Sequence, residues 1–411
     1  MDTTPFAPDT VSQCGPTWLD LEYIKKIIQR YTNNQLVEIK SFKVSSATAK
    51  GENYLSALYM LDVRYKNNVD DESETWERSF MLKTRLENEL VEQLEEHLDV
   101  FVREAQYYTA ISDEIDKLLG ADVSIFGPKT VYVDERIIVM ENLKLRGYSI
   151  GDVKQGLNES QCLLVLRKLG KFHAVSMVLY GKNPDIFRFH LPGNISDHPS
   201  PMHMIYKACV KTTIEYCNAT EDLKKFVPKL EVFGQSIIAK LINVYSRNLN
   251  DRYHVLNHGD VWVNNLMFHA HEPDVLFIDF QEGFYGSPGI DLNYLIFTSL
   301  QADVFQCHFD DLVLAYHQSL CDTLVELNYQ HRIPTLDDVK KEIYSKGFHG
   351  LATATCLLPI LINENTELAD PENFVLETDE AIQNRRKIFY NQNFGDRLKI
   401  FLKFFEDFGI L

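Results

Sequence analysis

Apolar and polar residues follow two different periods along this chain, and the change comes near residue 145. Residues 17–30 carry Leu19, Tyr23, Ile27 and Ile28 at helical spacing, which predicts a first helix. Runs of alternating or continuous apolar residues then predict strands at 36–44, 53–65, 77–86, 129–133 and 136–140. Between the second and third of these runs, the polar stretch KNNVDDESE reads as a hairpin loop.

One helix is expected to interrupt these strands. In residues 89–111, the apolar positions Leu94, Leu98, Phe101, Ala105 and Tyr108 recur at steps of three and four. This pattern is typical of a helix with one buried face. The first part of the chain is therefore predicted to form a mostly antiparallel sheet with one long helix inserted after its third strand.

Helical patterns dominate the rest of the chain, after a connector at 141–149. Asn158 followed by Gln161 is the signature of a capping box and predicts the start of a long helix. Further helical patterns cover 201–217, 221–248, 289–302, 310–327, 335–346 and 379–407. The one β interruption expected here is a short hairpin that joins 266–268 to 275–278.

Length and composition favour two lobes. The chain has 411 residues, and a chain of this length is usually too long for a single hydrophobic core. Hydrophobic residues make up 45% of it. We expect an α+β fold of two lobes, with an N-terminal lobe at 1–140, a hinge at 141–147 and a mostly helical C-terminal lobe at 148–411. The expected C-terminal lobe carries the short β-hairpin.

Charge and cysteine content narrow the partners and the compartment. A net charge of −18 argues against nucleic acid as a partner, although the simplest reading of that charge is solubility. No apolar run reaches the length of a membrane span, and the N-terminus does not resemble a secretory signal. Seven scattered cysteines without a CxxC pair fit reduced thiols. We expect a cytoplasmic monomer that does not bind membranes.

The segment HGDVWVNNLMF (258–268) and the later FIDFQ (277–281) hold the strongest chemical signal. A hairpin between them would return Asp279 to the loop that holds Asp260 and Asn265. Two carboxylates and one amide oxygen suit a hard cation such as Mg²⁺, whose remaining ligands come from water and substrate phosphates. One carboxylate could instead accept a proton from a hydroxyl, as in kinases. The structural alternative is that Asp260 and Asn265 cap a turn and Asp279 ends a strand.

These residues also carry a resemblance. HGDVWVNNLMF with FIDFQ resembles the H-G-D-x-x-x-x-N plus I-D-F pair of the aminoglycoside phosphotransferase and choline kinase-like superfamily. Together with YGSPGIDLNYLIFTS (285–299), it resembles the insect ecdysteroid kinase-like (CHK kinase-like) family more closely. The similarity runs from about residue 35 to the C-terminus, and the block 258–299 is its most specific part.

The resemblance implies a two-lobed, protein-kinase-like fold and a role for each matching residue. Asp260 would be the catalytic aspartate that accepts the proton of the acceptor hydroxyl, and Asn265 and Asp279 would bind Mg²⁺. Asp291 would support the catalytic loop through its backbone, although stabilisation of a helix N-terminus is an equal account. His258 would orient the loop and transfer no proton. His173, on the apolar face of its helix, is expected to be a core histidine.

ATP would need a cation for its phosphates. Lys83 in SFMLK is the candidate, because an ammonium on an apolar strand needs a counter-charge; the alternative is a lysine whose head reaches solvent. Several glutamates of the 89–111 helix could pair with it. The family phrase similar to FVREAQYYT selects Glu104, and the alternative is a solvated helix glutamate.

Two further ATP contacts are expected from backbone groups. The loop SSATAKGENYLS (45–56) has no GxGxxG, but its GENY resembles the family's phosphate loop, which implies Gly51, Glu52 and Asn53; a plain β-turn is the alternative. The hinge at RIIVMENL would contact adenine through the main chain from Glu141 to Leu143.

The acceptor is the least defined part. The resemblance implies an ATP- and Mg²⁺-dependent kinase that acts on a hydroxyl of a small, apolar molecule such as an ecdysteroid or a xenobiotic alcohol, bound in a pocket between C-terminal helices. Choline or ethanolamine, which would need an aromatic and acidic cage, is an alternative. A catalytically inactive pseudokinase is a second alternative, and the presence of Lys83, Asp260, Asn265 and Asp279 argues against it. A protein kinase is disfavoured by HGD in place of HRD and by the lack of an APE-like segment.

Overall fold

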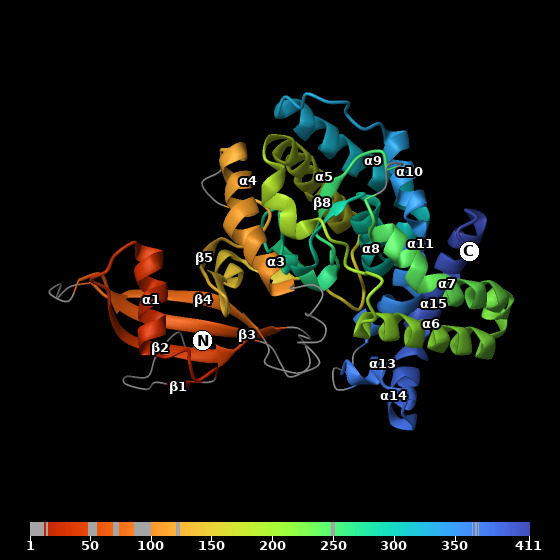
Figure 1. Ribbon diagram of the computed structural model, residues 1–411, viewed down its shortest axis with the longest axis horizontal. Helices are drawn as coiled ribbons and strands as arrows, with labels where there is room; N and C mark the ends of the chain where they lie inside the picture. The colour runs from red at the N-terminus through yellow and green to blue at the C-terminus, as the bar shows by residue number, and fades with distance from the viewer. Residues whose placement is uncertain are drawn as a thin grey trace. The chain divides into compact units, whose positions relative to one another are not determined.

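The chain folds into two compact units, described here separately (Figure 1). The computed structural model describes residues 12–13, 15–47, 56–68, 74–85, 100–120, 124–247, 251–363, 365, 368 and 370–411. Unit 1 comprises the described residues of Met1–Val91 and Pro128–Arg146, and unit 2 those of Glu92–Gly127 and Gly147–Leu411. The segment between the fourth and fifth strands therefore belongs to unit 2, while the predicted lobe boundaries at 140 and 147 stay a prediction.

Unit 1 is a sheet covered by one helix. Its strands are β1 (Ser12–Gln13), β2 (Glu38–Ser46), β3 (Ser56–Lys66), β4 (Trp76–Arg85), β5 (Thr130–Val133) and β6 (Ile137–Glu141). They lie in the order β1-β2-β3-β4-β6-β5, antiparallel except for the short β1, which pairs parallel with β2 at the edge. The five predicted strands are all present, and β1 was not predicted because two residues carry no periodic signal.

Helix α1 (Leu21–Thr32) lies across this sheet (Figure 1). Asp20 caps its N-terminus, because its carboxylate accepts from the Tyr23 amide at 2.9 Å. Ile24, Ile27 and Ile28 are fully buried against apolar residues of the strands. The amphipathic pattern of the sequence therefore predicts both the helix and the face that it buries.

The helix predicted at 89–111 lies in unit 2 where it is described. It consists of α3 (Val100–Gln106), a π-helical turn (Tyr107–Ile111) and α4 (Ser112–Leu119) in direct succession. Residues 89–99 fall outside the described residues. The helix continues past the predicted end at 111, because Ile115 extends the buried face, and it ends at Gly120, whose φ of +61° favours glycine.

The helices of unit 2 follow the predicted order with a few differences in length. They are α5 (Glu159–Lys182), α6 (Pro201–Ala219), α7 (Val227–Tyr245), α8 (Gly289–Ser299), α9 (Ala302–Glu326), α10 (Leu336–Ser345), α11 (Gly347–Ala352), α12 (Leu358–Leu361), α13 (Glu372–Val375), α14 (Asp379–Phe389) and α15 (Gln392–Asp407). The predicted capping box of Asn158 and Gln161 is present at the start of α5. The single helix predicted at 379–407 is wrong: Asn391 caps a new helix, α15, after a break at Tyr390.

Unit 2 also holds more β structure than predicted. The expected hairpin is β9 (Leu266–His269) with β10 (Val275–Phe277), and β7 (Tyr148–Ile150) adds a third strand beside β9. A separate pair joins β8 (Val255–Asn257) to β11 (Phe284–Gly286). The unpredicted strands β7, β8 and β11 have three residues each, too few for a period to be recognised in the sequence. The α+β class with a mostly helical second part is confirmed.

Among the described helices, none is both long enough and apolar enough to cross a bilayer.

Candidate active site

The HGD segment directly follows strand β8, which holds it beside the end of the DFQ segment. Asn257 pairs with Phe284 across β8 and β11, and its side-chain amide donates to the Phe284 carbonyl at 3.1 Å. Gly259 has a φ of +84°, and a Cβ there would lie 2.0 Å from the carbonyl oxygen of Glu282. Only glycine fits this close approach of two backbones. The glycine of HGD therefore sets how tightly the loop meets residue 282.

The Asp291 carboxylate binds the backbone of the same loop. Its fully buried carboxylate accepts from the backbone amides of His258 at 2.6 Å and Gly259 at 2.8 Å. The Nε2 of His173 lies 3.1 Å from the same carboxylate, and the His173 Nδ1 lies 2.8 Å from the Tyr316 hydroxyl. Asp291 thus contacts the loop backbone, as the resemblance implies, and His173 is a buried histidine that contributes a bond to this support.

Both ring nitrogens of His258 are occupied within the protein. Its Nε2 donates to the Ile278 carbonyl at 3.0 Å, and its Nδ1 accepts from the Asp260 amide at 3.3 Å. Ile278 directly precedes Asp279, so the imidazole links the two motif segments. The fully buried ring is thus held between the two motif segments by both of its nitrogens, and its predicted role in orienting the loop stays a prediction.

The structure brings Asp260, Asn265 and Asp279 together. The Asn265 side-chain amide donates to the Asp260 backbone carbonyl at 2.9 Å and to the Asp260 carboxylate Oδ2 at 2.8 Å. The backbone carbonyl of Asn265 accepts from the backbone amide of Ile278 at 3.0 Å, and Ile278 directly precedes Asp279. The β9–β10 hairpin produces this proximity, because it pairs Leu266 with Phe277.

Asp279 adopts an unusual backbone conformation. Its φ is +69° in the left-handed region, which few residues other than glycine occupy. Aspartate tolerates this conformation better than a branched residue, but it is still strained. Strain of this kind is often found at functional positions, and here it sets the direction of a half-buried carboxylate.

The surroundings of Asp260 oppose its ionisation. Burial, followed by the negative charge of Asp279, raises the pKa of Asp260 to about 7. Hydrogen bonds from the Tyr294 hydroxyl and the Asn265 amide act in the opposite direction. Two neighbouring carboxylates of this kind are stabilised by a cation.

The residues fit Mg²⁺ better than a transition metal. The Asn265 NH₂ group is engaged with Asp260, so its Oδ1 would be the ligand atom, beside the carboxylate of Asp279. Over the described part of the chain, no group of three or more His, Cys, Asp or Glu side chains could hold a metal ion by itself. An all-oxygen site with few protein ligands is typical of Mg²⁺ that also binds phosphates.

The residues predicted to bind ATP lie in both units. Lys83 is 4% exposed on β4, opposite Leu58 of β3 and Ile138 of β6, so its head does not reach solvent as the alternative required. Glu104 is 1% exposed on α3, so it is not a solvated helix glutamate. Their pairing with each other stays a prediction. Gly51, Glu52 and Asn53 lie outside the described residues.

At the predicted hinge, several groups are already engaged. The Glu141 amide donates to the Lys129 carbonyl at 2.9 Å, and the Glu141 carboxylate accepts from the Lys129 amide and from Arg146, both at 2.8 Å. Leu143 is buried at the start of a short 3-10 helix, Leu143–Arg146. The predicted contact of this segment with adenine stays a prediction.

Sequence reasoning missed Tyr294 and Asn257. Tyr294 donates to Asp260 from helix α8, and Asn257 accepts from the Asp291 amide at 3.1 Å. Every residue of α8 is buried, so a tyrosine there reads as core. The one available signal was its position one turn after Asp291.

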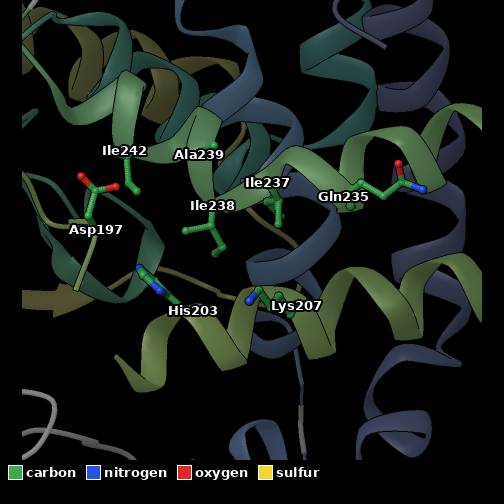
Figure 2. A pocket seen from close by; sticks show the side chains of 9 residues that line it. Asp197, His203, Lys207, Gln235, Ile237, Ile238, Ala239 and Ile242 are labelled. Carbon is green, nitrogen blue, oxygen red and sulfur yellow. The ribbon is translucent and has the colours of Figure 1, made fainter. Parts of the chain in front are cut away.

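A pocket of about 350 Å³ lies between α6 and α7 (Figure 2). The isoleucines Ile237, Ile238 and Ile242 of α7 line one side, and His203 and Lys207 of α6 line the other (Figure 2). The remaining lining residues are Asp197, Gly234, Gln235 and Ala239. Apolar and polar side chains thus share the lining of the pocket, and its size is within the range of small-molecule sites.

Comparison with known proteins identifies the family. The family model described as "Ecdysteroid kinase-like family" matches residues 50–329. No curated protein matches. Among solved structures, an ethanolamine kinase of Plasmodium vivax is similar at 13% identity over 91% of this chain and 90% of its own, with a TM-score of 0.42. A putative aminoglycoside phosphotransferase of Ralstonia eutropha JMP134 is similar at 12% identity over 94% and 98%, with a TM-score of 0.43.

A spectinomycin phosphotransferase solved with ADP and spectinomycin is also similar, at 13% identity over 92% of this chain and 97% of its own, with a TM-score of 0.40. The family match extends from before β3 through β8 to β11, and therefore includes the whole segment that carries Asp260, Asn265, Asp279 and Asp291. The chain belongs to the ecdysteroid kinase-like family.

Proposed function

We propose that this protein transfers the γ-phosphate of ATP to a hydroxyl group of a small, mainly apolar molecule such as an ecdysteroid or a xenobiotic alcohol. The observation that carries the proposal is the convergence of Asp260, Asn265 and Asp279 on one loop and one hairpin. These are the groups that phosphoryl transfer needs: a carboxylate for the attacking hydroxyl and oxygen ligands for a divalent cation.

In this proposal, Asp260 accepts the acceptor's O–H proton while the hydroxyl oxygen forms a bond to the γ-phosphorus. The bond between that phosphorus and the β–γ bridging oxygen breaks, and ADP leaves. Asn265 Oδ1 and Asp279 would bind Mg²⁺, which neutralises charge on the phosphates when it is bound. Asp291, His258 and His173 keep the loop backbone in place. Lys83 would bind the nucleotide phosphates, and Glu104 would pair with Lys83.

The first test is direct. The purified protein is incubated with ATP, Mg²⁺ and a panel of steroids, glycosides and amino alcohols, and products are identified by mass spectrometry as phosphate esters. We expect Asp260→Asn to abolish ester formation while ATP still binds, as measured by calorimetry. Wild-type rates in this variant would remove Asp260 from its proposed role. A wild-type protein that binds ATP but phosphorylates no member of the panel would favour the pseudokinase alternative.

The α6–α7 pocket supports an apolar acceptor over choline. Three isoleucines form one wall, and no Phe, Tyr or Trp is among the lining residues, whereas quaternary ammonium groups are bound by the faces of these rings. The end of α7 lies near the catalytic carboxylates: Tyr245, one turn after Ile242, interacts electrostatically with Asp260. An acceptor could therefore place its apolar body in this pocket and its hydroxyl toward the catalytic loop.

The second test concerns this pocket. We expect Ile238→Asp to raise the KM for an apolar acceptor by about tenfold or more, because loss of one buried apolar side chain costs about 1.5–3 kcal/mol. The KM for ATP should not change. Val232→Asp, on the same helix and 66% exposed, is the matched control. Equal acceptor KM values in the two variants would place the acceptor elsewhere.

A further inference from the structure

Arg103 is a buried cation with neutral hydrogen-bond partners. It lies on α3 and is only 3% exposed. One guanidinium nitrogen donates to the Asn194 side-chain oxygen, and the other donates to the Pro192 carbonyl at 3.1 Å. Burial lowers the pKa of Arg103, and the carboxylate of Glu282 acts against this shift. Removing a guanidinium from water is costly, so loss of either acceptor would leave a buried charge with an unsatisfied donor.

Asn194 passes this restraint to the DFQ turn. While its side-chain oxygen accepts from Arg103, its side-chain NH₂ donates to the Glu282 carbonyl at 2.9 Å. That carbonyl is the same atom that lies against Gly259 of the catalytic loop. Glu282 closes the one-turn helix Phe280–Glu282 that begins directly after Asp279. Arg103 is therefore two hydrogen bonds away from the backbone that joins both carboxylate segments.

The two tyrosines that directly follow α3 contact the Phe280–Glu282 turn at a second point. The ring of Tyr107 stacks on Phe280, with centroids 3.7 Å apart and planes at 11°. Tyr108 meets Phe280 edge-on at 5.9 Å. Two contacts thus connect the Phe280–Glu282 turn to α3 and the π-helical turn after it (100–111). One is made by the Phe280 side chain, and the other runs from the Glu282 backbone through Asn194.

We propose that Arg103 is a positioning residue: through Asn194 it fixes the backbone of Glu282, and thereby the relative positions of Asp279 and Asp260. The inference rests on the proposed function for its catalytic meaning, but the positioning itself can be measured without phosphoryl transfer. A role of this kind does not follow from the HGD and DFQ motifs, because Arg103 and Asn194 lie outside both.

Three variants separate this relay from general stability. Arg103→Gln removes the charge. Asn194→Asp retains an acceptor for Arg103 but removes the donor to Glu282, so the helix stays anchored while the link to the turn is cut. Arg385→Gln is the control for loss of a buried guanidinium elsewhere in unit 2: Arg385 is 1% exposed and donates to the backbone carbonyls of Asn373 and Leu376 and to the Glu377 carboxylate.

The readouts are hydrogen exchange of the metal-free protein and calorimetric titration with Mn²⁺ in the presence of ADP. We expect Arg103→Gln and Asn194→Asp to speed exchange of the amides at 258–260 and 279–283, and to weaken Mn²⁺ binding by about tenfold, as is typical when support of a metal site is lost. Arg385→Gln should speed exchange only around α13 and α14. Asn194→Asp decides the outcome if Arg103→Gln does not fold.

Wild-type exchange and Mn²⁺ affinity in Asn194→Asp would overturn the proposal. So would an equal effect of Arg385→Gln on the two site segments. If the variants behave as expected but the wild-type protein phosphorylates no acceptor, the positioning role stands and the proposed function fails. If the wild-type protein transfers phosphate and Asn194→Asp is indistinguishable from it in exchange and Mn²⁺ binding, the reverse holds.

Discussion

At the scale of single residues, Asp260 shows how an environment adjusts a carboxyl group. An ordinary aspartate ionises near pH 4, and burial together with Asp279 raises the pKa of Asp260 to about 7. In the absence of metal, the folded protein therefore holds a proton at Asp260 that the unfolded chain releases. Between about pH 4 and pH 7 the unfolded chain has lost this proton while the folded protein keeps it. The free energy of unfolding therefore falls as the pH rises through this range.

This shift leads to a prediction for the metal-free protein. Asp260→Asn cannot ionise and so avoids the cost. Its melting temperature, measured by calorimetry in the presence of a chelator, should exceed that of the wild type by an amount that grows from about pH 4 to pH 7 and levels off above pH 7. The difference should shrink when Mg²⁺ and ADP are added, because a bound cation stabilises the carboxylate. A difference that is constant over this pH range would contradict the raised pKa.

The same scale shows which site residues could be read from the sequence. Asp260, Asn265 and Asp279 are polar groups beside apolar runs. Because burying such groups is costly, their position in the sequence already indicates a functional role. The sequence did not single out Arg103 as a site residue. Its helix also carries several glutamates that could be buried, and its hydrogen-bond partner Asn194 lies on another segment of the chain. Gly51 and Asn53 belong to a segment outside the described residues, so their role stays a prediction.

At the scale of elements, short backbone segments place the chemistry. The HGD loop depends on β8 and β11, which have three residues each, and on the close contact of Gly259 with Glu282. Sequence periodicity predicted the long helices and the main sheet but not these strands, since three residues do not define a period. Their pairing is decided by the tertiary contacts of the loop that they support.

Gly259 allows a matched test at this scale. Gly259→Ala would place a Cβ 2.0 Å from the Glu282 carbonyl at a positive φ, so two backbones must separate. Gly120→Ala, at a φ of +61° with no atom within 4 Å, meets only the conformational cost of about 1–2 kcal/mol. We expect urea unfolding to show a clearly larger loss of stability for Gly259→Ala, with loss of phosphoryl transfer. Equal losses in the two variants would mean that the loop can move away from Glu282.

At the scale of the whole molecule, the residues predicted to take part in the reaction are divided between the two units. Unit 2 carries Asp260, Asn265 and Asp279, whereas Lys83 is buried in the sheet of unit 1. The chain returns to unit 1 after 92–127, so the α3 segment is inserted between strands of one unit while it belongs to the other.

This division predicts separate kinetic effects. Lys83→Met should lower kcat/KM for ATP by about tenfold or more, since a hydrogen bond to a charged group contributes about 1.5–3 kcal/mol. The exchange behaviour of the Asp260 loop should be unchanged. Lys40→Met, an exposed lysine paired with Glu38 on β2, serves as the control. An unchanged kcat/KM for ATP in Lys83→Met would refute its proposed contact with the nucleotide.

The sequence by itself determined the α+β class, the main strands and helices, and the identity of the polar groups at 258–281, because periodicity and the cost of burying polar atoms are local properties. Only the tertiary structure decided how these groups are held. Tyr294 meets Asp260 across the core of unit 2, and Arg103 reaches Glu282 through Asn194. Partners so far apart along the chain leave no pattern in it, since their contact exists only once the helices and hairpins have packed.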